Sequence, residues 1–407
     1  MGESSTISLA EGRFTRFQAI RWWDQSLLKD ARVLVVGAGA LGNEVIKNLS
    51  LLGVGHLVVI DMDRIETSNL CRSVLFREGD EGDFKADVAA RAAEALYPQM
   101  QATAVVGNVL SDVGLGYFKW AQVVVGALDN REARVFVNSV CAQVNRPWID
   151  GGIDVLSGIV RGFDPPETAC YECTMGQTDW DLLAKRRSCS LLARQAFAEG
   201  GAPTTPTTAS IVGAIQAQEV IKRLHGMQAL AGEGYVFEGL THNSYQVSYQ
   251  ISPDCPWHES PTPVEPMPNW GSETTLRDIW EWGVARFDGL DAIDLSRELV
   301  ERLDCPSCGR SKQVLESIER ITENQAVCEG CGGEYIPGFL HSIGADSPLM
   351  GMRIKELGLP EWDIVWVRKG SQAVGIEFLA DCPDSLAIDQ SCLPEVQERG
   401  EKEIEEE

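Results

Sequence analysis

The feature that most restricts the fold is a glycine-rich turn between an apolar strand pattern and a helical pattern near the start of the chain. The apolar run at residues 32–36 is followed by Gly37, Gly39 and Gly42, and residues 40–52 have the spacing of an amphipathic helix. Glycines at such a turn let backbone N–H groups approach a phosphate, which the positive end of the helix also attracts. The segment therefore predicts a nucleotide-binding turn.

The residues after this turn favour a triphosphate over a dinucleotide. Asp61 closes the next apolar run about 20 residues beyond the glycines, where a carboxylate holds a ribose in nucleotide-binding folds. The plainer interpretation of Asp61 is a turn residue at a strand end. Asp63, Asn69 and Arg72 follow in a polar insertion that a dehydrogenase pattern does not require. An arginine and an asparagine at this place indicate contacts with a triphosphate.

Strand and helix patterns alternate through the first part of the chain. Apolar runs recur at residues 57–60, 102–106 and 122–126, and helical patterns at residues 85–96 and 131–144 lie between them. This alternation predicts an α/β fold with a Rossmann-like, doubly wound and mostly parallel sheet. Two later apolar segments, at residues 234–240 and 244–252, are expected to close this domain as a hairpin.

Composition divides the chain into segments. We expect a helical lead-in at residues 1–30, a nucleotide-binding domain at 31–259 with a crossover loop around 174–207, a Pro-rich linker at 260–272, a small α/β or mostly β second domain at 273–393, and an acidic disordered tail at 394–407.

Charge and hydropathy exclude several classes of partner. The net charge of −25 argues against a nucleic acid, whose phosphates require a basic face. No segment approaches the roughly 20 apolar residues that span a bilayer, and no apolar export signal precedes the first charges. We therefore expect a cytoplasmic protein with no membrane partner. The 12 cysteines include several Cys-x-x-Cys pairs, which in such a chain favour zinc over disulfides.

The strongest metal signal lies in the second domain. Four cysteines have the spacing C-x₂-C-x₁₉-C-x₂-C: Cys305, Cys308, Cys328 and Cys331. A closed shell of four thiolates is typical of structural zinc and leaves no position open for catalysis. We therefore predict a structural zinc ribbon.

Two charged residues complete the predicted nucleotide site. Lys85 stands where a helical pattern begins, and Asp129 follows a buried strand pattern. Each has an ordinary interpretation, a surface charge for the lysine and a helix cap for the aspartate. Together with Arg72 they supply cations for phosphate charge and a carboxylate for Mg²⁺, and an open α/β sheet gathers strand-end residues into one crevice.

Six blocks that occur in order carry a resemblance to a known family. They are GAGALG, DMDRIETSNLCR, FKAD, ALDNREAR, ACYEC and TTASIVGAIQAQEVIK, within residues 13–258. The chain resembles the ThiF/MoeB and ubiquitin-activating enzyme family over this range. The resemblance implies that Asp61 binds the ATP ribose, that Asn69, Arg72 and Lys85 lie near the phosphates, and that Asp129 binds magnesium. It also includes Asp63 and Asn130 in the nucleotide site.

The resemblance further implies a dimer and a second metal site. Arg16, in RFTRFQAI, is similar to an arginine that reaches the partner subunit's ATP, which implies a homodimer. The segment SPDCPWH resembles the family's second cysteine pair with a histidine in the last place. The implied zinc ligands are Cys170, Cys173, Cys255 and His258. The alternative is that the cysteines are buried core residues that bind no metal and that the histidine is unrelated to them. Cys71 departs from the family pattern beside Arg72.

Cys189 is the candidate nucleophile. It follows the basic run Lys185, Arg186 and Arg187, and cationic neighbours lower the pKa of a thiol toward the reactive thiolate. Ubiquitin-activating relatives often carry a thioester cysteine at this place, whereas other relatives adenylate without one, and a free cysteine is often simply a small core residue.

Together with these features, the resemblance implies an ATP-dependent enzyme that adenylates the carboxy-terminal glycine of a ubiquitin-like protein and passes it to Cys189, with a conjugating enzyme as a further partner. The nearest alternative is a sulfur-carrier adenylyltransferase in thiamine or molybdenum cofactor synthesis. A non-catalytic zinc scaffold is an alternative from another class, and a nicotinamide dehydrogenase is the most distant one.

Overall fold

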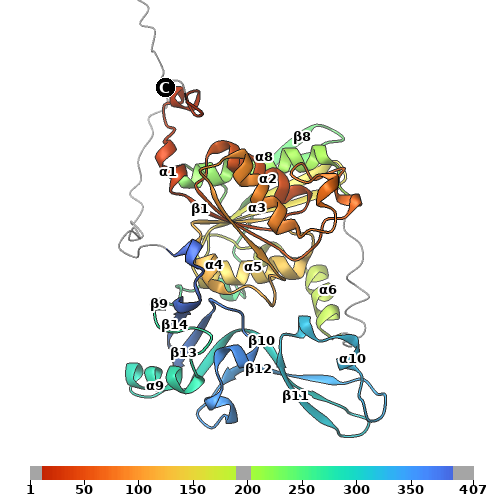
Figure 1. Cartoon of the computed structure of the whole chain (residues 1–407), viewed down its shortest axis with the longest axis vertical. Coiled ribbons are helices and arrows are strands. Elements are labelled where there is room, and N and C mark those ends of the chain that lie inside the picture. Colours follow the sequence, from red (N-terminus) through yellow and green to blue (C-terminus); the bar gives the residue numbers. More distant parts are fainter. Residues whose placement is uncertain (1–11, 189–202, 388–407) are drawn as a thin grey trace, which may run out of the picture.

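The computed structural model describes residues 12–188 and 203–387, and within this range the side chains of residues 184–188 are not described. Cys189 and the predicted acidic tail lie outside the described residues. The chain forms two sheets that belong to successive parts of the sequence (Figure 1).

The first sheet has eight strands in the order β3-β2-β1-β4-β5-β6-β7-β8. Their bounds are β1 (Arg32–Val36), β2 (His56–Asp61), β3 (Gln101–Val106), β4 (Val123–Gly126), β5 (Trp148–Asp154), β6 (Ser157–Phe163), β7 (Glu233–Glu238) and β8 (Asn243–Ser248). The pairs from β3 to β5 are parallel, and the pairs from β5 to β8 are antiparallel. The predicted α/β class with a parallel-rich Rossmann-like sheet is confirmed, and the predicted hairpin is β7–β8.

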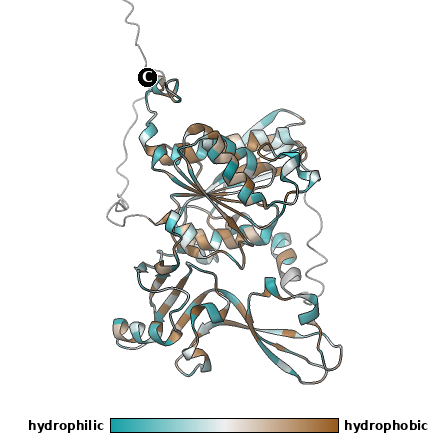
Figure 2. Cartoon of the chain, viewed as in Figure 1, coloured by the Kyte–Doolittle hydropathy of each residue, from teal (hydrophilic) through white to brown (hydrophobic). Residues whose placement is uncertain are grey.

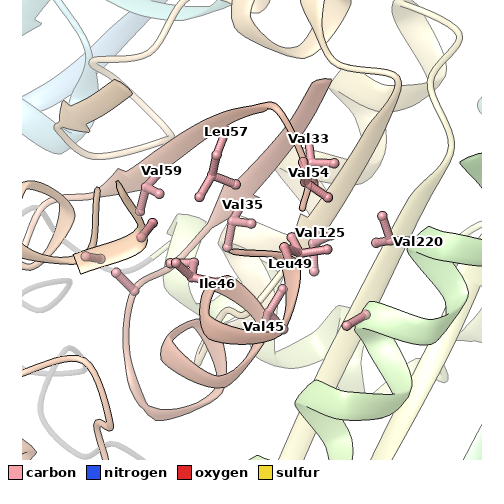
Figure 3. Packing of buried hydrophobic residues seen from close by; sticks show 14 of the residues in the cluster. Val33, Val35, Val45, Ile46, Leu49, Val54, Leu57, Val59, Val125 and Val220 are labelled. Carbon is pink, nitrogen blue, oxygen red and sulfur yellow. The ribbon is translucent and has the colours of Figure 1, made fainter. Parts of the chain in front are cut away.

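Helices cover both faces of this sheet. On one face lie α2 (Ala40–Leu52), α3 (Lys85–Leu96) and α8 (Pro206–Leu224), and on the other α4 (Leu115–Trp120) and α5 (Arg131–Gln143) (Figure 1). Successive side chains of a strand point to opposite faces, so Val33 and Val35 of β1 pack under α2 while Leu34 and Val36 pack toward α4 and α5. Figure 3 labels residues of the first face, among them Val33, Val35, Leu57 and Val59 from the strands and Val45, Ile46 and Leu49 from α2.

The lead-in is less helical than the sequence suggests. Residues 17–19 form a single 3₁₀ turn, and only α1 (Gln25–Lys29) is an α-helix, capped by Asp24 through the N–H of Ser26 at 2.9 Å. Phe14 packs against Gly53, directly beyond the last residue of α2. Aromatic packing of this kind, rather than a continuous helix, holds the segment on the domain.

The second sheet contains β9 (Val264–Met267), β10 (Ala292–Asp304), β11 (Ser311–Glu316), β12 (Ile336–Ile343), β13 (Ile364–Lys369) and β14 (Gln372–Phe378). Its order is β11-β10-β13-β14-β9, and β12 pairs with β10. The helices of this part are α9 (Leu276–Phe287) and α10 (Glu323–Ala326), and residues of α9 share a buried cluster with β13 and β14. Strand β9 lies inside the segment predicted as a linker, where it pairs in parallel with β14.

The two parts of the chain share a buried interface. Trp362 and Ile364 belong to the same apolar cluster as the helices α4 and α5. The backbone N–H of Gly116 donates to the carbonyl of Trp362 at 2.9 Å, and a Cβ on this glycine would lie 2.5 Å from the indole ring. Such a close approach requires glycine. Figure 2 shows apolar colour along the strands and on the helix faces that cover them.

Buried charges also cross this interface. The side chain of Arg297 is 4% exposed and donates to the carbonyls of Leu110 and Val113, at 3.0 and 2.8 Å. Asp363 lies 3.7 Å from its guanidinium and accepts from the N–H of Leu115. Desolvation by burial raises the pKa of Asp363, while Arg297 acts to lower it. Because each buried charge has partners in the other part of the chain, the second domain is fixed on the first.

Among the described residues, no helix combines the length and the apolar character that a membrane span requires.

Candidate active site

The glycine-rich turn forms as predicted between β1 and α2. Gly37 has a φ of 99°, and a Cβ at this residue would lie 2.4 Å from the carbonyl oxygen of Ala127. Gly39 directly precedes α2, and a Cβ there would meet open space. The N-terminal end of α2 therefore opens outward without a covering side chain, as a phosphate site requires.

Asp61 ends β2 and points back to this turn. Its Oδ2 accepts the N–H of Ala38 at 2.7 Å, and its Oδ1 accepts the N–H of Asp63 at 2.8 Å. Desolvation by burial raises the pKa of Asp61, against the effect of these two bonds and of the charge of Lys85. Each carboxylate oxygen keeps a lone pair, so the group is oriented and still able to accept from hydroxyls.

Lys85 and Asp63 are brought together although 22 residues separate them. The amine Nζ lies 2.7 Å from the Oδ2 of Asp63, and the lysine side chain is only 13% exposed. The N–H of Lys85, at the start of α3, also donates to the carbonyl of Asp63 at 2.9 Å. Lys85 is therefore a held cation beside the turn and not the solvated surface charge of the ordinary interpretation.

Asn69 and Arg72 lie in a short loop after β2. The side chain of Asn69 is buried and accepts the N–H of Glu66 at 3.1 Å, which stabilises the 3₁₀ turn Thr67–Asn69. Arg72 donates through Nη1 to the carbonyl of Ser68 at 2.6 Å, and the exposed Cys71 lies against the same carbonyl. In this arrangement Asn69 shapes the loop that presents Arg72.

Asn43 belongs to the site and was not identified from the sequence. Its Nδ2 donates to the carbonyls of Ala38 and Gly39 at 2.7 and 3.1 Å, and its Oδ1 accepts the N–H of Leu75 at 2.8 Å. This fully buried amide ties the glycine turn to the polar insertion. The available signal was an amide on the apolar face of a helix, directly after Gly42.

Asp129 and Asn130 follow β4 and begin α5. Asn130 is the helix cap, since its Oδ1 accepts the N–H of Ala133 at 2.8 Å, and its Nδ2 donates to Asp129 at 3.1 Å. Asp129 itself is exposed. Because Ala127 packs against Gly37, the start of α5 lies at the same sheet edge as the glycine turn.

A cavity of about 510 Å³ opens beside Asp129. Its walls come from the start of α5, from Arg161 of β6, from Tyr171 and Met175, and from α6 (Gln177–Ser188) through Asp179 and Leu183. Arg131 of α5 and Asp179 of α6 form an ion pair of 2.9 Å across the cavity wall.

A buried carboxylate that the sequence analysis missed supports this cavity. Asp150 of β5 is fully buried and binds the guanidinium groups of both Arg134, at 2.9 Å, and Arg161, at 3.1 Å. Burial acts to lower the pKa of Arg134, but the charge and hydrogen bond of Asp150, together with Tyr171 and Asp129, outweigh it, so this pKa is raised. Two guanidinium groups share this one carboxylate, and the wall also holds the exposed carboxylate of Asp129.

Arg16 lies away from the glycine turn of its own chain. It is exposed on the lead-in, where the nearby Phe14 packs at the far end of α2. A helix of 13 residues is about 20 Å long, so the structure does not bring Arg16 to the turn. Cys189, which follows the last residue of α6, lies outside the described residues.

The first predicted zinc ligand set is assembled. The ligand atoms of Cys170, Cys173, Cys255 and His258 all lie within 4.8 Å of one another, with Sγ–Sγ distances of 3.5 and 3.7 Å. Tetrahedral zinc with Zn–S bonds near 2.3 Å places sulfurs about 3.8 Å apart. His258 lies with Nδ1 3.0 Å from the carbonyl of Pro166, which leaves Nε2, 3.1 Å from the Cys173 sulfur, free to bind metal.

The second ligand set is assembled in the second domain. Cys305, Cys308, Cys328 and Cys331 gather between β10, β11 and β12, with Sγ–Sγ distances of 3.5 Å (Cys305–Cys331) and 3.6 Å (Cys308–Cys328). Both sets fit the donor number and spacing of structural zinc.

Replacing Cys308 with Ser is expected to lower the zinc content from about two ions to about one per chain, because one thiolate of a closed shell is lost. Metal analysis of the purified protein measures this, and Cys71→Ser, which removes an exposed thiol outside both sets, is the matched control. Equal zinc content in all three proteins would contradict the assignment of the ribbon.

Comparisons with known proteins cover the first domain. A sulfur carrier protein adenylyltransferase from Thermus thermophilus is 32% identical over 238 residues, which are 57% of this chain and 83% of that protein. The NEDD8-activating enzyme E1 catalytic subunit from Saccharomyces cerevisiae is 37% identical over 155 residues, 36% of this chain and 52% of that protein. The chain thus spans about half of the latter relative.

Among solved structures, E. coli MccB with ATP aligns with a TM-score of 0.52 and 22% identity, over 64% of this chain and 77% of that chain. This likeness shows a shared fold. Residues 12–256 match the ThiF family, a range that contains the glycine turn, the polar insertion and Asp129. The chain belongs to the ThiF family.

Proposed function

We propose that this protein uses ATP to adenylate the terminal carboxylate of a ubiquitin-like or sulfur-carrier protein. The observation that carries the proposal is the convergence of the glycine turn, the held Lys85–Asp63 pair and the Asp129 segment at one edge of the sheet. The relatives named as adenylyltransferase and activating enzyme support it.

The reaction that suits these groups is adenylyl transfer, a substitution at the α-phosphorus of ATP. A carboxylate oxygen of the carrier bonds to the α-phosphorus, and the bond to the bridging oxygen breaks, so pyrophosphate leaves and an acyl adenylate forms. Lys85 and Arg72 offset the charge on the phosphates, and Asp61 holds the ribose. Asp129 would hold Mg²⁺, which supplies further charge neutralisation when bound. Positioning, rather than a general base, carries the rate.

ATP–pyrophosphate exchange tests this proposal. We expect radiolabelled pyrophosphate to enter ATP only when a carrier protein with a free carboxy-terminal glycine is present. The control is the same carrier with its last residue removed. Absence of exchange with every ubiquitin-like and sulfur-carrier candidate would refute the proposal.

The geometry also supports a homodimer in which Arg16 acts on the partner's ATP. Phe14 fixes the lead-in at the end of α2 opposite the glycine turn. Arg16 therefore lies far from the proposed nucleotide site of its own chain. In a two-fold dimer, the same segment can serve the site of the other subunit.

For the step after adenylation, we propose Cys189 as acceptor of the carrier, in a thioester that a conjugating enzyme then receives. Residues of α6 line the cavity beside Asp129, and Cys189 follows α6 in the sequence. In this step the cysteine sulfur bonds to the carrier carbonyl and AMP leaves.

With ATP and carrier, wild-type protein is expected to give a band on a non-reducing gel that a thiol reagent removes and that Cys189→Ala lacks. Adenylation itself should be unchanged in this variant. Persistence of the band in Cys189→Ala would exclude Cys189 and assign the thioester to another cysteine, whereas absence of the band from wild-type protein would favour the sulfur-carrier alternative without a protein thioester.

A further inference from the structure

One side chain joins the first metal-ligand set to the helix that carries Asp129. Asn138 lies on α5 two turns after its start and is fully buried. Its Nδ2 lies 3.5 Å from the Sγ of Cys170, and its Oδ1 accepts the N–H of Tyr171 at 2.8 Å. The amide thus binds both a metal ligand and the residue after it.

Glu172 extends this link to the second half of the ligand set. Its Oε1 accepts from Asn138 at 3.3 Å and from the indole N–H of Trp257 at 2.6 Å. Trp257 lies between Cys255 and His258 in the sequence. Both halves of the ligand set therefore converge, through Glu172, on one amide of α5.

The other end of the link is the cavity wall. The ring of Tyr171 lines the cavity, and the guanidinium of Arg161 lies 4.8 Å from its centre. Arg161 binds Asp150, which binds Arg134 of α5. The contacts form a closed ring that starts and ends on α5.

We propose that Asn138 is a positioning residue through which metal binding at the first ligand set fixes α5 and the cavity wall beside Asp129. Partners of metal ligands orient the ligands and tune the metal, and here the partner is part of the helix that begins at the active site. Without metal, the Cys170 sulfur that Asn138 contacts is no longer held to the other three ligands, so the anchor of Tyr171 and α5 is weakened. The importance of the cavity for catalysis rests on the proposed function, whereas the coupling itself does not.

The first test is hydrogen exchange of the whole protein, with metal and after its removal by a chelator. We expect the amides of Val135 to Val137 on α5 to exchange at least about ten-fold faster after removal, whereas the amides of β2 remain unchanged. An unchanged exchange rate on α5 would overturn the proposal. This measurement needs no variant and no substrate, so it stands even if the protein adenylates nothing.

The second test uses Asn138→Asp, which keeps the oxygen that accepts from Tyr171. Its other oxygen would face the Cys170 sulfur and the Glu172 carboxylate, and like charges repel. We expect release of zinc to a colorimetric chelator to accelerate about 10–100-fold. The matched control is Ser139→Ala, whose hydroxyl binds only the carbonyl of Phe136 among the contacts described, at 2.8 Å. Wild-type release from Asn138→Asp would overturn the proposal.

Discussion

Replacing Asp129 with Ala is expected to lower the rate of ATP–pyrophosphate exchange by about 10²–10³-fold, the loss typical when one charge-stabilising group is removed. Asp129 is exposed beside the cavity and does not cap α5, which Asn130 does. The fold should therefore survive, and the loss should appear in kcat at saturating Mg²⁺. The control is Asp346→Ala, an exposed carboxylate of the second domain.

A mixing experiment extends this prediction to the proposed dimer. Arg16→Ala alone should also be inactive if Arg16 serves the partner's site. When the two inactive proteins exchange subunits, half of the dimers are mixed, and each mixed dimer has one site with both residues intact, so roughly a quarter of wild-type activity returns. Recovery of none would show that Arg16 acts within its own chain, and an active Arg16→Ala protein would show that Arg16 is not required. Full exchange activity in Asp129→Ala would instead revive the non-catalytic scaffold.

Replacing Asp150 with Asn is expected to destabilise the fold by about 3–5 kcal/mol, the cost of removing one partner from a buried charge cluster. Arg134 and Arg161 would both lose their shared carboxylate while remaining largely buried, at 13% and 15% side-chain exposure. Urea unfolding, monitored by tryptophan fluorescence, measures the change. The cavity should also lose its shape, so the KM for the carrier protein should rise.

The matched control is Asp179→Asn, which breaks the ion pair with Arg131 at the rim of the same cavity. Both partners are more exposed there, at 29% and 52%, so the expected loss is below about 1 kcal/mol. Equal destabilisation by the two variants would mean that burial does not set the energy of these pairs.

The sequence predicted those helices and strands whose pattern of apolar residues is regular over several turns or residues. The α2 and α3 helices have the predicted bounds, because their apolar spacing and the preceding glycine turn or strand end leave little choice. Strand β5 and helix α4 were not predicted, since β5 contains two glycines and two aspartates and α4 has only six residues. Strand β9 was not predicted because its segment is rich in proline, which is typical of a linker. An edge strand such as β9 nevertheless tolerates proline.

The residues of the candidate site also fall into a group that the sequence predicts and a group that it does not. The glycine turn, Asp61 and the four-cysteine set follow from spacing along the chain, the set with His258 follows from the family resemblance, and the structure assembles each of them. Asn43, Asn138 and Asp150 were missed because each has a partner 11 to 34 residues away, in another element. A polar residue in an apolar pattern reveals that a partner exists, but only the fold reveals which one.

The docking of Trp362 extends the interior of the first domain beyond the residues that match the ThiF family. The family match stops at residue 256, yet α4 presents Gly116 and Tyr117 to an indole that arrives more than 240 residues later. A chain truncated after residue 256 would expose the apolar surface of α4 that Trp362 covers in the intact protein. We therefore expect the unit that unfolds cooperatively in this protein to be larger than the range that matches the ThiF family.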